Sequence, residues 1–302
     1  YSTRYKAKDF LNNLDGNRFS TSFFNQLLVR PETRATFTLN DNNSFIGGIG
    51  FNHETLNRTD FTESPEFNSP YVYLQYDGHI TPKLNLIVGA RLDSHNKYQS
   101  QFSPKVAARY ELSDYLAIKG SVGYGFKAPD FRQLYFDFTN ATVGYTVLGY
   151  NAVVTAIPKL NEQGQIANII VPISEFNNEL NPENSISINF GVDLNLPSGL
   201  KFSVNLFRNN IDDLIDTRVI ANKTNGQNIF SYYNVNKVYT QGLEFNTSWK
   251  ITQNLKISGG YQLLYAFDKN AIKAFENGEV YARLNSSSPS FIQNRILIKA
   301  LI

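Results

Sequence analysis

Side chains suited to ligand capture gather in one stretch of the chain, residues 128–184, which lacks regular strand patterning. Aromatic side chains with polar tips bury a large area and still hold hydrogen bonds, which suits a bulky, partly apolar ligand. The same side chains would equally serve to pack the stretch on itself or to form an aromatic girdle at a membrane interface. The candidate ligand-binding residues are Phe131, Arg132, Tyr135, Phe136, Phe138, Tyr145 and Tyr150.

Two further expectations concern the same stretch. Its Arg132, together with Lys127 and Arg91, favours an anionic ligand. Residues 145–173 are expected to form a β-hairpin of their own. The stretch is therefore interpreted as a long loop that grips a ligand.

No catalytic constellation stands out elsewhere. The chain has three histidines and no cysteine. The absence of cysteine excludes disulfides, thiolate metal sites and cysteine nucleophiles. Asp212 and Asp213 suggest a turn or a strand exit more than a cation site. The glycine-rich residues 47–50 are not a phosphate loop, because no helix follows them. We expect a protein that is not an enzyme, with no metal site and no cofactor.

Composition narrows the class of protein. The chain has 302 residues with 28 basic and 26 acidic side chains, so nothing indicates nucleic-acid binding. Aromatic residues make up 14%, with 18 Tyr and 23 Phe, which is typical of β structure or of aromatic girdles. No apolar run approaches the ~20 residues of a membrane-spanning helix.

Apolar residues alternate with polar ones over most of the chain, which predicts β-strands. A soluble sheet with one face in water shows the same alternation. The segments are longer than the ~5–6 residues of ordinary strands, and they reach the ~9–11 residues that a tilted strand needs to cross a bilayer. Short turns also alternate with long polar loops, as in an outer-membrane barrel. A large soluble barrel or propeller is the alternative.

The predicted fold class is therefore all-β, an antiparallel transmembrane β-barrel with short periplasmic turns and long extracellular loops. About twelve strands are expected, and polar residues on them should face the lumen. The expected strands are 1–9, 28–40, 44–54, 70–80, 84–96, 104–112, 115–127, 185–195, 200–212, 234–251, 254–268 and 290–302. The expected lumen-facing or plug-facing residues are Arg91, Arg109, Glu111, Lys119 and Glu244.

Two motifs flank the long loop. The segment "GYGFKAPDFRQLY" ends one strand, and "NNELNPENSISINFGVD" begins the next. This pair resembles the aromatic-Arg-Ala-Pro box and the Asn-Pro-x-Leu-x-Pro-Glu-x-Ser segment of TonB-dependent outer-membrane receptors. Residues 207–215, 239–245 and 288–302 also resemble strands of that family. The motif positions are Phe126, Lys127 (where Arg is usual), Ala128, Pro129, Leu180, Pro182 and Glu183.

The resemblance implies a barrel of about 22 strands filled by an N-terminal plug domain, with a short box that binds TonB. About twelve strands are fewer than such a barrel needs. We therefore expect residues 1–302 to be a partial barrel domain, with the plug not present in this chain. A complete twelve-stranded barrel is the alternative.

The resemblance also implies function. It indicates a receptor and transporter of the bacterial outer membrane that binds a scarce large nutrient and imports it with TonB-coupled energy. A ferric siderophore is the first candidate, and cobalamin or a haem-type chelate follows. Residues 130–177 lack histidine, which disfavours haem capture by the family's usual route. The alternatives are a passive porin and a surface-binding barrel without transport.

Partners follow from the same resemblance. The expected partners are outer-membrane lipid, the receptor's own plug domain, the TonB complex and a small-molecule metal chelate, with no nucleic acid. The loop is expected to close on the ligand above the lumen, while the lumen-facing charges pair with the plug.

Overall fold

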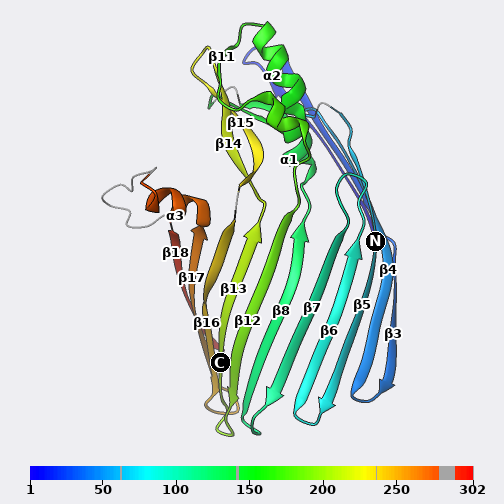
Figure 1. The fold of residues 1–302 in the computed structure, drawn as a ribbon, viewed down its shortest axis with the longest axis vertical. Coiled ribbons are helices and arrows are strands. Elements are labelled where there is room, and N and C mark those ends of the chain that lie inside the picture. The colour runs from blue at the N-terminus through cyan, green and yellow to red at the C-terminus, as the bar shows by residue number, and fades with distance from the viewer. Residues whose placement is uncertain (62, 141–142, 236, 279–289, 302) are drawn as a thin grey trace.

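A computed structural model of the chain describes residues 1–61, 63–140, 143–235, 237–278 and 290–301. Long strands lie side by side in one large curved sheet, and a smaller unit stands above one end of it (Figure 1). We call this smaller unit, residues 128–182 and 213–235, the cap. The rim of the sheet next to the cap is called the outer rim.

The large sheet contains thirteen strands in the described part of the chain, all paired antiparallel. Its two terminal strands in the order of pairing, β1 and β18, do not pair with each other, so the barrel is not closed within the described residues. The alternative of a complete twelve-stranded barrel is therefore wrong. The strands are β1 (Ser2–Asn12), β2 (Arg18–Val29), β3 (Glu32–Asn40), β4 (Asn43–Arg58), β5 (Glu66–Thr81), β6 (Leu84–Asp93), β7 (Gln101–Glu111), β8 (Leu116–Lys127), β12 (Glu183–Asn195), β13 (Leu200–Asp212), β16 (Val238–Lys250), β17 (Lys256–Asp268) and β18 (Ser290–Leu301).

The first forty residues differ from the prediction. A single strand was expected over 28–40, but the structure has β2 and β3, separated at Arg30 and Pro31. Proline lacks an N–H group and interrupts a strand's hydrogen-bond ladder. Its carbonyl still accepts a hydrogen bond from the N–H of Phe51 (3.1 Å), so both strands lie along β4.

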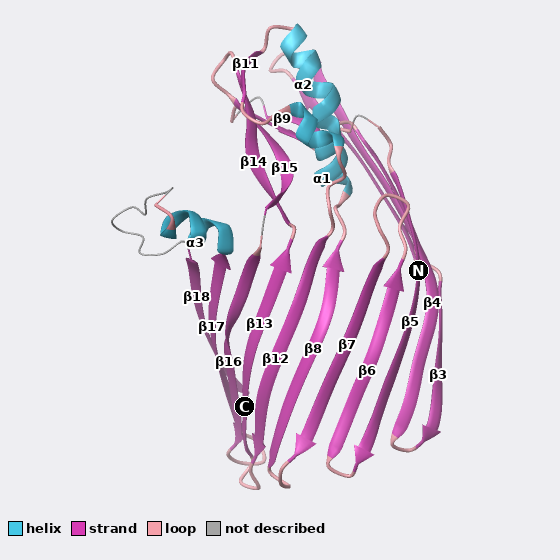
Figure 2. Cartoon of the chain, in the orientation of Figure 1, coloured by secondary structure: helices cyan, strands magenta, loops and turns pink. Residues whose placement is uncertain are grey.

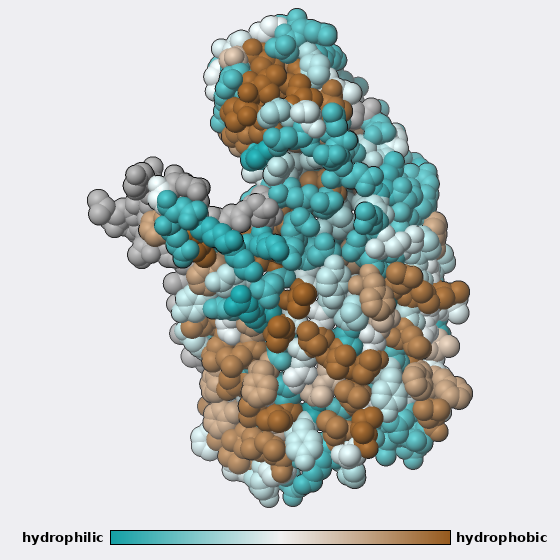
Figure 3. Space-filling model, in the orientation of Figure 1, coloured by the Kyte–Doolittle hydropathy of each residue, from teal (hydrophilic) through white to brown (hydrophobic). Residues whose placement is uncertain are grey.

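Apolar side chains of the large sheet are exposed rather than buried. Along β12, Ile186, Ile188 and Phe190 are 45, 48 and 51% exposed, while the alternate residue Asn189 bonds to Ser121 on β8. Figure 3 shows brown, hydrophobic side chains gathered over the strands, and teal, hydrophilic ones between this band and the cap. A sheet that turns its apolar face outward and its polar face inward is suited to contact with lipid.

From β3 onward, connections alternate in length as predicted. Short turns lie together at the rim farthest from the cap, and longer connections lie at the outer rim (Figure 2). One predicted long connection, 269–289, falls partly outside the described residues, and its first part forms the helix α3 (Lys269–Glu276). The short turns are 41–42, 82–83, 112–115, 196–199 and 251–255.

The cap contains helices as well as strands. Its strands form a five-stranded sheet in the order β11-β14-β15-β10-β9, in which β10 and β15 run parallel. Among the described residues, no helix is long and apolar enough to cross a membrane. The cap elements are α1 (Phe131–Tyr135), β9 (Asp137–Asn140), β10 (Tyr145–Leu148), η1 (Tyr150–Ala152), α2 (Val153–Glu162), β11 (Ile166–Ile169), η2 (Ile173–Asn177), β14 (Leu214–Lys223) and β15 (Asn228–Val235).

The predicted β-hairpin over 145–173 is wrong. Strands β10 and β11 form at its two ends, but they pair with β15 and β14 rather than with each other. Helix α2 separates them, because Val153, Ala156 and Ile157 recur at helical spacing and are buried on one face. The long loop predicted beyond Asp213 is likewise structured, as the hairpin β14–β15.

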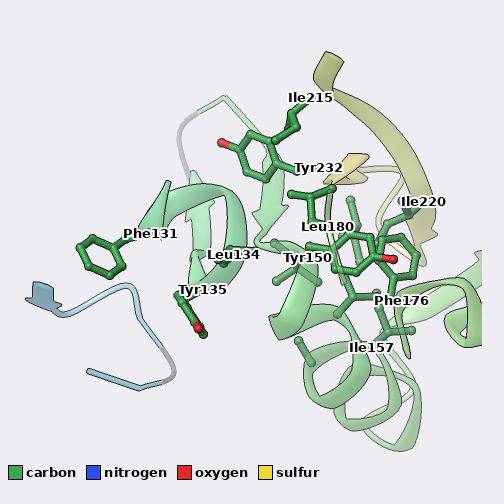
Figure 4. Packing of buried hydrophobic residues seen from close by; sticks show 14 of the residues in the cluster. Phe131, Leu134, Tyr135, Tyr150, Ile157, Phe176, Leu180, Ile215, Ile220 and Tyr232 are labelled. Carbon is green, nitrogen blue, oxygen red and sulfur yellow. The ribbon is translucent and has the colours of Figure 1, made fainter. Parts of the chain in front are cut away.

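The cap is built around a hydrophobic core that Leu56 on β4 and Phe67 on β5 join from the large sheet, whereas the inward face of that sheet is polar. Leu148, Ile220 and Ile229 are at most 1% exposed, and helix α2 contributes Ile157. Figure 4 shows these helices and strands turning their apolar side chains toward one another. Burial of apolar surface stabilises the folded state by roughly 25 cal/mol per Å². With such a core, the cap is a folded unit rather than a flexible loop.

Replacing Ile157 by Ala should unfold the cap selectively. Removing a fully buried isoleucine side chain costs about 2–5 kcal/mol in lost burial and cavity formation, while the strands of the large sheet do not depend on this residue. Limited proteolysis of the intact protein should cut within 128–182, with the heat-modifiable gel migration of the large sheet unchanged. The control Ile170→Ala alters a 49% exposed residue of the same unit and should leave proteolysis as in the wild type.

Candidate ligand-binding region at the outer rim

The two motif segments meet where the large sheet gives way to the cap. Lys127 at the end of β8 faces Glu183 at the start of β12, and their side chains form an ion pair of 3.0 Å. The same Glu183 oxygen accepts a hydrogen bond from the N–H of Ile215 on β14 (3.2 Å). One carboxylate therefore ties together β8, β12 and β14, which are the strands that lead into and through the cap.

Other motif residues fill this junction. Pro129, Leu180 and Pro182 are buried, and Leu180 belongs to the cap core at 2% exposed. Phe126 and Ala128 are half-buried where β8 ends. The motif positions therefore fix how the cap is attached to the sheet.

A capping box starts the cap immediately after this junction. The Asp130 side chain accepts a hydrogen bond from the N–H of Gln133 (2.7 Å), and the Gln133 side chain accepts one from the N–H of Asp130 (2.9 Å). Helix α1 that follows is only one turn long. It directs Phe131 and Tyr135 into the interior.

Three of the predicted ligand-binding aromatic residues are buried. Phe131, Tyr135 and Tyr150 are 4, 3 and 5% exposed, and all three belong to the cap core. The Tyr150 hydroxyl donates to the carbonyl of Glu175 (2.6 Å), and burial raises the pKa of Tyr135. For these three residues the structure matches the alternative interpretation, in which the aromatic side chains pack the stretch on itself.

The other predicted residues remain accessible. Arg132 is exposed, whereas Phe136, Phe138 and Tyr145 are partly exposed. Four aromatic rings lie in a row. Their centroids are 5.4 Å apart for Phe136 and Phe138, 6.5 Å for Phe138 and Tyr145, and 6.4 Å for Tyr145 and Phe230 on β15. We call these four residues the aromatic row. Phe230 was not among the predicted residues, because it lies in a segment predicted to be a loop.

The cap is braced against β4 and the connection that follows it. The Arg58 guanidinium forms an ion pair with Asp60 (2.6 Å) and lies over the rings of Phe24, Phe61 and Phe136 at 5.0–5.7 Å. The N–H of Asp137 donates to the carbonyl of Asp60 (2.6 Å). The cap therefore contacts the sheet at a second place, apart from its attachment at Glu183.

A cavity of about 380 Å³ lies at the outer rim below helix α1. Aromatic rings form part of its wall: His95 and Tyr98 stack at 3.6 Å, and Phe67 stacks at 3.9 Å on Phe131. The sequence offered no sign of this group, because His95 and Tyr98 stand alone in a connection between strands. The charged residues lining the cavity are Arg30, Glu54, Asp93 and Asp130.

His95 is a neutral hydrogen-bonding group in this wall. Its Nδ1 accepts a hydrogen bond from the N–H of Lys97 (3.0 Å), which leaves the proton on Nε2. Burial, with a smaller effect of the Lys97 charge, lowers the pKa of His95 to about 4. The ring therefore supplies a donor and an aromatic face rather than a positive charge.

The predicted lumen-facing charges pair largely within the wall of the sheet. Asp193 accepts from Arg109 and Lys119 at 2.8 Å each. Three of the predicted residues, Arg109, Lys119 and Glu244, line a groove of about 480 Å³. Their pairing with a plug stays a prediction. The other contacts are Glu111 to Arg109 (3.9 Å), Arg91 to Asp93 (2.6 and 2.7 Å), and Glu244 to Asn205 (3.3 Å) and Gln262 (3.1 Å).

Metal coordination by the chain itself finds no support in the part that the structure describes. No group of three or more His, Asp or Glu side chains lies close enough to hold an ion there. Aromatic rings, amides and a few charges are what this region offers to a ligand.

Comparisons with known proteins agree on one family. The family model described as "TonB dependent receptor-like, beta-barrel" matches residues 1–293. An iron-regulated outer membrane virulence protein of Vibrio cholerae is 26% identical over 206 residues, covering 66% of this chain and 27% of that protein. The ferric enterobactin receptor PirA of Pseudomonas aeruginosa is 24% identical over 243 residues, covering 78% of this chain and 30% of that protein.

Solved structures support the fold. The crystal structure of the siderophore receptor PirA from Pseudomonas aeruginosa aligns with a TM-score of 0.62 at 21% identity, covering 83% of this chain and 46% of that one. The chain spans less than a third of the length of the two curated relatives, at 27 and 30%. The large sheet thus corresponds to part of a longer receptor barrel.

Replacing Glu183 by Gln should loosen the junction without removing a strand. A hydrogen bond to a charged acceptor contributes about 1.5–3 kcal/mol, so amide exchange at Ile215 should accelerate about tenfold or more. Hydrogen exchange of the intact receptor in detergent, read by mass spectrometry, measures this. Glu179→Gln, at an exposed position nearby, is the matched control. Equal exchange in both variants would contradict a clasp role for Glu183.

His95 should remain neutral in mild acid. Because its pKa in the folded protein lies at about 4, below the ordinary 6.5, the folded form disfavours protonation. Its contribution to stability is complete above pH 6.5 and declines as the pH falls toward 4. An NMR titration of the imidazole resonance in the intact protein should give a midpoint at about pH 4, well below that of free histidine. A midpoint like that of free histidine would contradict the burial.

Proposed function

This chain belongs to the TonB-dependent receptors, whose β-barrels lie in the bacterial outer membrane, and we propose that the whole receptor binds a ferric siderophore at its outer rim and imports it. The observation that carries the proposal is a folded cap that holds the aromatic row above the outer rim. Relatives named as siderophore and ferric enterobactin receptors support the choice of cargo. The family consists of receptors that transport rather than of enzymes.

The ligand meets a preformed surface in this proposal. The cap has a buried core and contacts the sheet at Glu183, at Arg58 and through the Phe67–Phe131 stack, so it offers a shape that exists before binding. Preorganisation lowers the entropy that binding costs. Arg132, Phe138 and Tyr145 are the proposed contacts, and the buried rings of the cap core support them from behind.

A plug domain inside the barrel completes the proposal. The inward face of the sheet carries a groove of about 480 Å³, lined by polar residues such as Asn189, Asn205 and Arg109. Amides and paired charges of this kind suit hydrogen bonding to another folded domain. Energy for import would reach the plug through the TonB complex.

Uptake by living cells tests the function. Cells carrying the intact gene should accumulate ⁵⁵Fe supplied as siderophore complexes under iron limitation, and deletion of the gene should abolish the uptake. Deletion of TonB should abolish it as well, since a passive pore needs no energy. Uptake that persists without TonB would favour a porin.

Replacing Tyr145 by Ala should weaken siderophore binding about tenfold. Truncating an aromatic contact at the centre of a binding surface commonly costs about 1–2 kcal/mol of binding free energy. Fluorescence quenching of the purified intact receptor measures the affinity. Tyr115→Ala is the matched control, since Tyr115 is 47% exposed in a short turn at the opposite rim. Unchanged affinity for Tyr145→Ala would remove the aromatic row from the binding surface.

A further inference from the structure

The cap differs in charge from the rest of the chain. Residues 128–182 and 213–235 contain seven acidic and four basic side chains, whereas the whole chain contains 26 acidic and 28 basic ones. The cap is therefore net negative on a net positive protein. Charges act over a screening length of ~8 Å at physiological salt, so a ligand approaching the cap meets a negative field first.

Three basic residues in or near the cap are paired with carboxylates, whereas Arg132 on the cap is exposed. Lys127 pairs with Glu183 at 3.0 Å, Arg91 with Asp93 at 2.6 Å, and Arg218 with Glu175 at 2.9 Å. Two of these three, Lys127 and Arg91, were the residues expected from the sequence to attract an anion. A basic side chain already bound to a carboxylate offers little net charge to a ligand.

The cavity below α1 is also lined by more acidic than basic side chains. Its lining contains the carboxylates of Glu54, Asp93 and Asp130 and the guanidinium of Arg30. Asp93 is paired with Arg91, so two carboxylates stand against one guanidinium. Arg30 itself donates to the Tyr71 hydroxyl (3.2 Å) and lies 3.6 Å from Glu32. The aromatic rings of the wall add π faces, which favour cations over anions. The negative charge of the cap therefore continues down to the rim.

Known classes of ferric chelate differ in charge. Ferric iron bound by three hydroxamates is neutral at the metal centre, because each hydroxamate carries one negative charge. Ferric iron bound by three catecholates is a trianion, because each catecholate carries two. A negative rim repels the second class and tolerates the first.

We propose, on the basis of the function proposed above, that this receptor selects ferric chelates of neutral or positive charge, of the trihydroxamate class, over trianionic triscatecholate chelates. The selecting surface is the cap together with the acidic, aromatic cavity beneath helix α1. Selection arises by repulsion of the wrong ligand as much as by contacts with the right one.

Direct binding distinguishes the outcomes. The purified intact receptor is titrated with ferrioxamine B, a trihydroxamate complex, and with ferric enterobactin, a triscatecholate complex, at low and at physiological salt. Ferrioxamine B should bind at least about tenfold more tightly, and the difference should shrink as salt rises. Equal or tighter binding of ferric enterobactin overturns the proposed selectivity and leaves the proposed function standing. Binding of neither chelate, with no iron uptake by cells, overturns both.

A charge-reversal variant tests the cause. Glu162→Lys combined with Glu179→Lys makes the cap net positive, and both side chains are exposed. Affinity for ferric enterobactin should rise about tenfold, while that for ferrioxamine B should change much less. Asp41→Lys with Asp114→Lys makes the same change in charge at two exposed turns of the opposite rim. A rise of the same size in that control, or no rise in the cap variant, overturns the proposal.

Discussion

A strand that crosses lipid has to pair every backbone N–H and C=O group with a neighbouring strand, because hydrocarbon offers no partner. The whole of the large sheet follows from this constraint. Lateral pairing frees the side chains from building a core, so apolar residues turn outward to lipid and polar residues turn inward. The cap lies beyond the band of apolar side chains and is surrounded by water, so its apolar side chains are buried in a core, as in water-soluble proteins. It buries its apolar residues, and its helices and short strands exist only because that core holds them.

This division explains which parts of the fold the sequence reveals. A strand between lipid and a polar lumen alternates strictly, and segments such as β12 and β13 were predicted within two residues of their observed ends. Beyond the apolar band both faces of a strand meet water, and the alternation fades. Strand β2 begins at Arg18 in such a region, and the prediction began it ten residues too late. Pro31 was the visible signal that one predicted strand was two.

The candidate site was harder to predict than the wall. Aromatic residues in a loop look alike in a sequence whether they are exposed or buried, and only packing separates Tyr135 from Tyr145. The neighbours that bury or expose each ring come from distant parts of the chain. Tyr145 on β10 lies opposite Asn228 on β15, and no local sequence pattern predicts this parallel pair. The motif residues were recognisable, yet their role at the junction depends on Glu183 of β12 reaching both Lys127 of β8 and the backbone of Ile215 on β14.

The interleaved order of the cap sheet, β11-β14-β15-β10-β9, has a consequence for biogenesis. Two chain segments build the cap, and the hairpin of β12 and β13 separates them. Neither segment can bury its apolar residues alone, so the entropy of bringing them together must be spent by pairing β12 with β13 first. We therefore expect the cap to form after β12 has paired with β13, and a chain stalled before that step to expose unburied isoleucines such as Ile220 and Ile229 to chaperones and proteases.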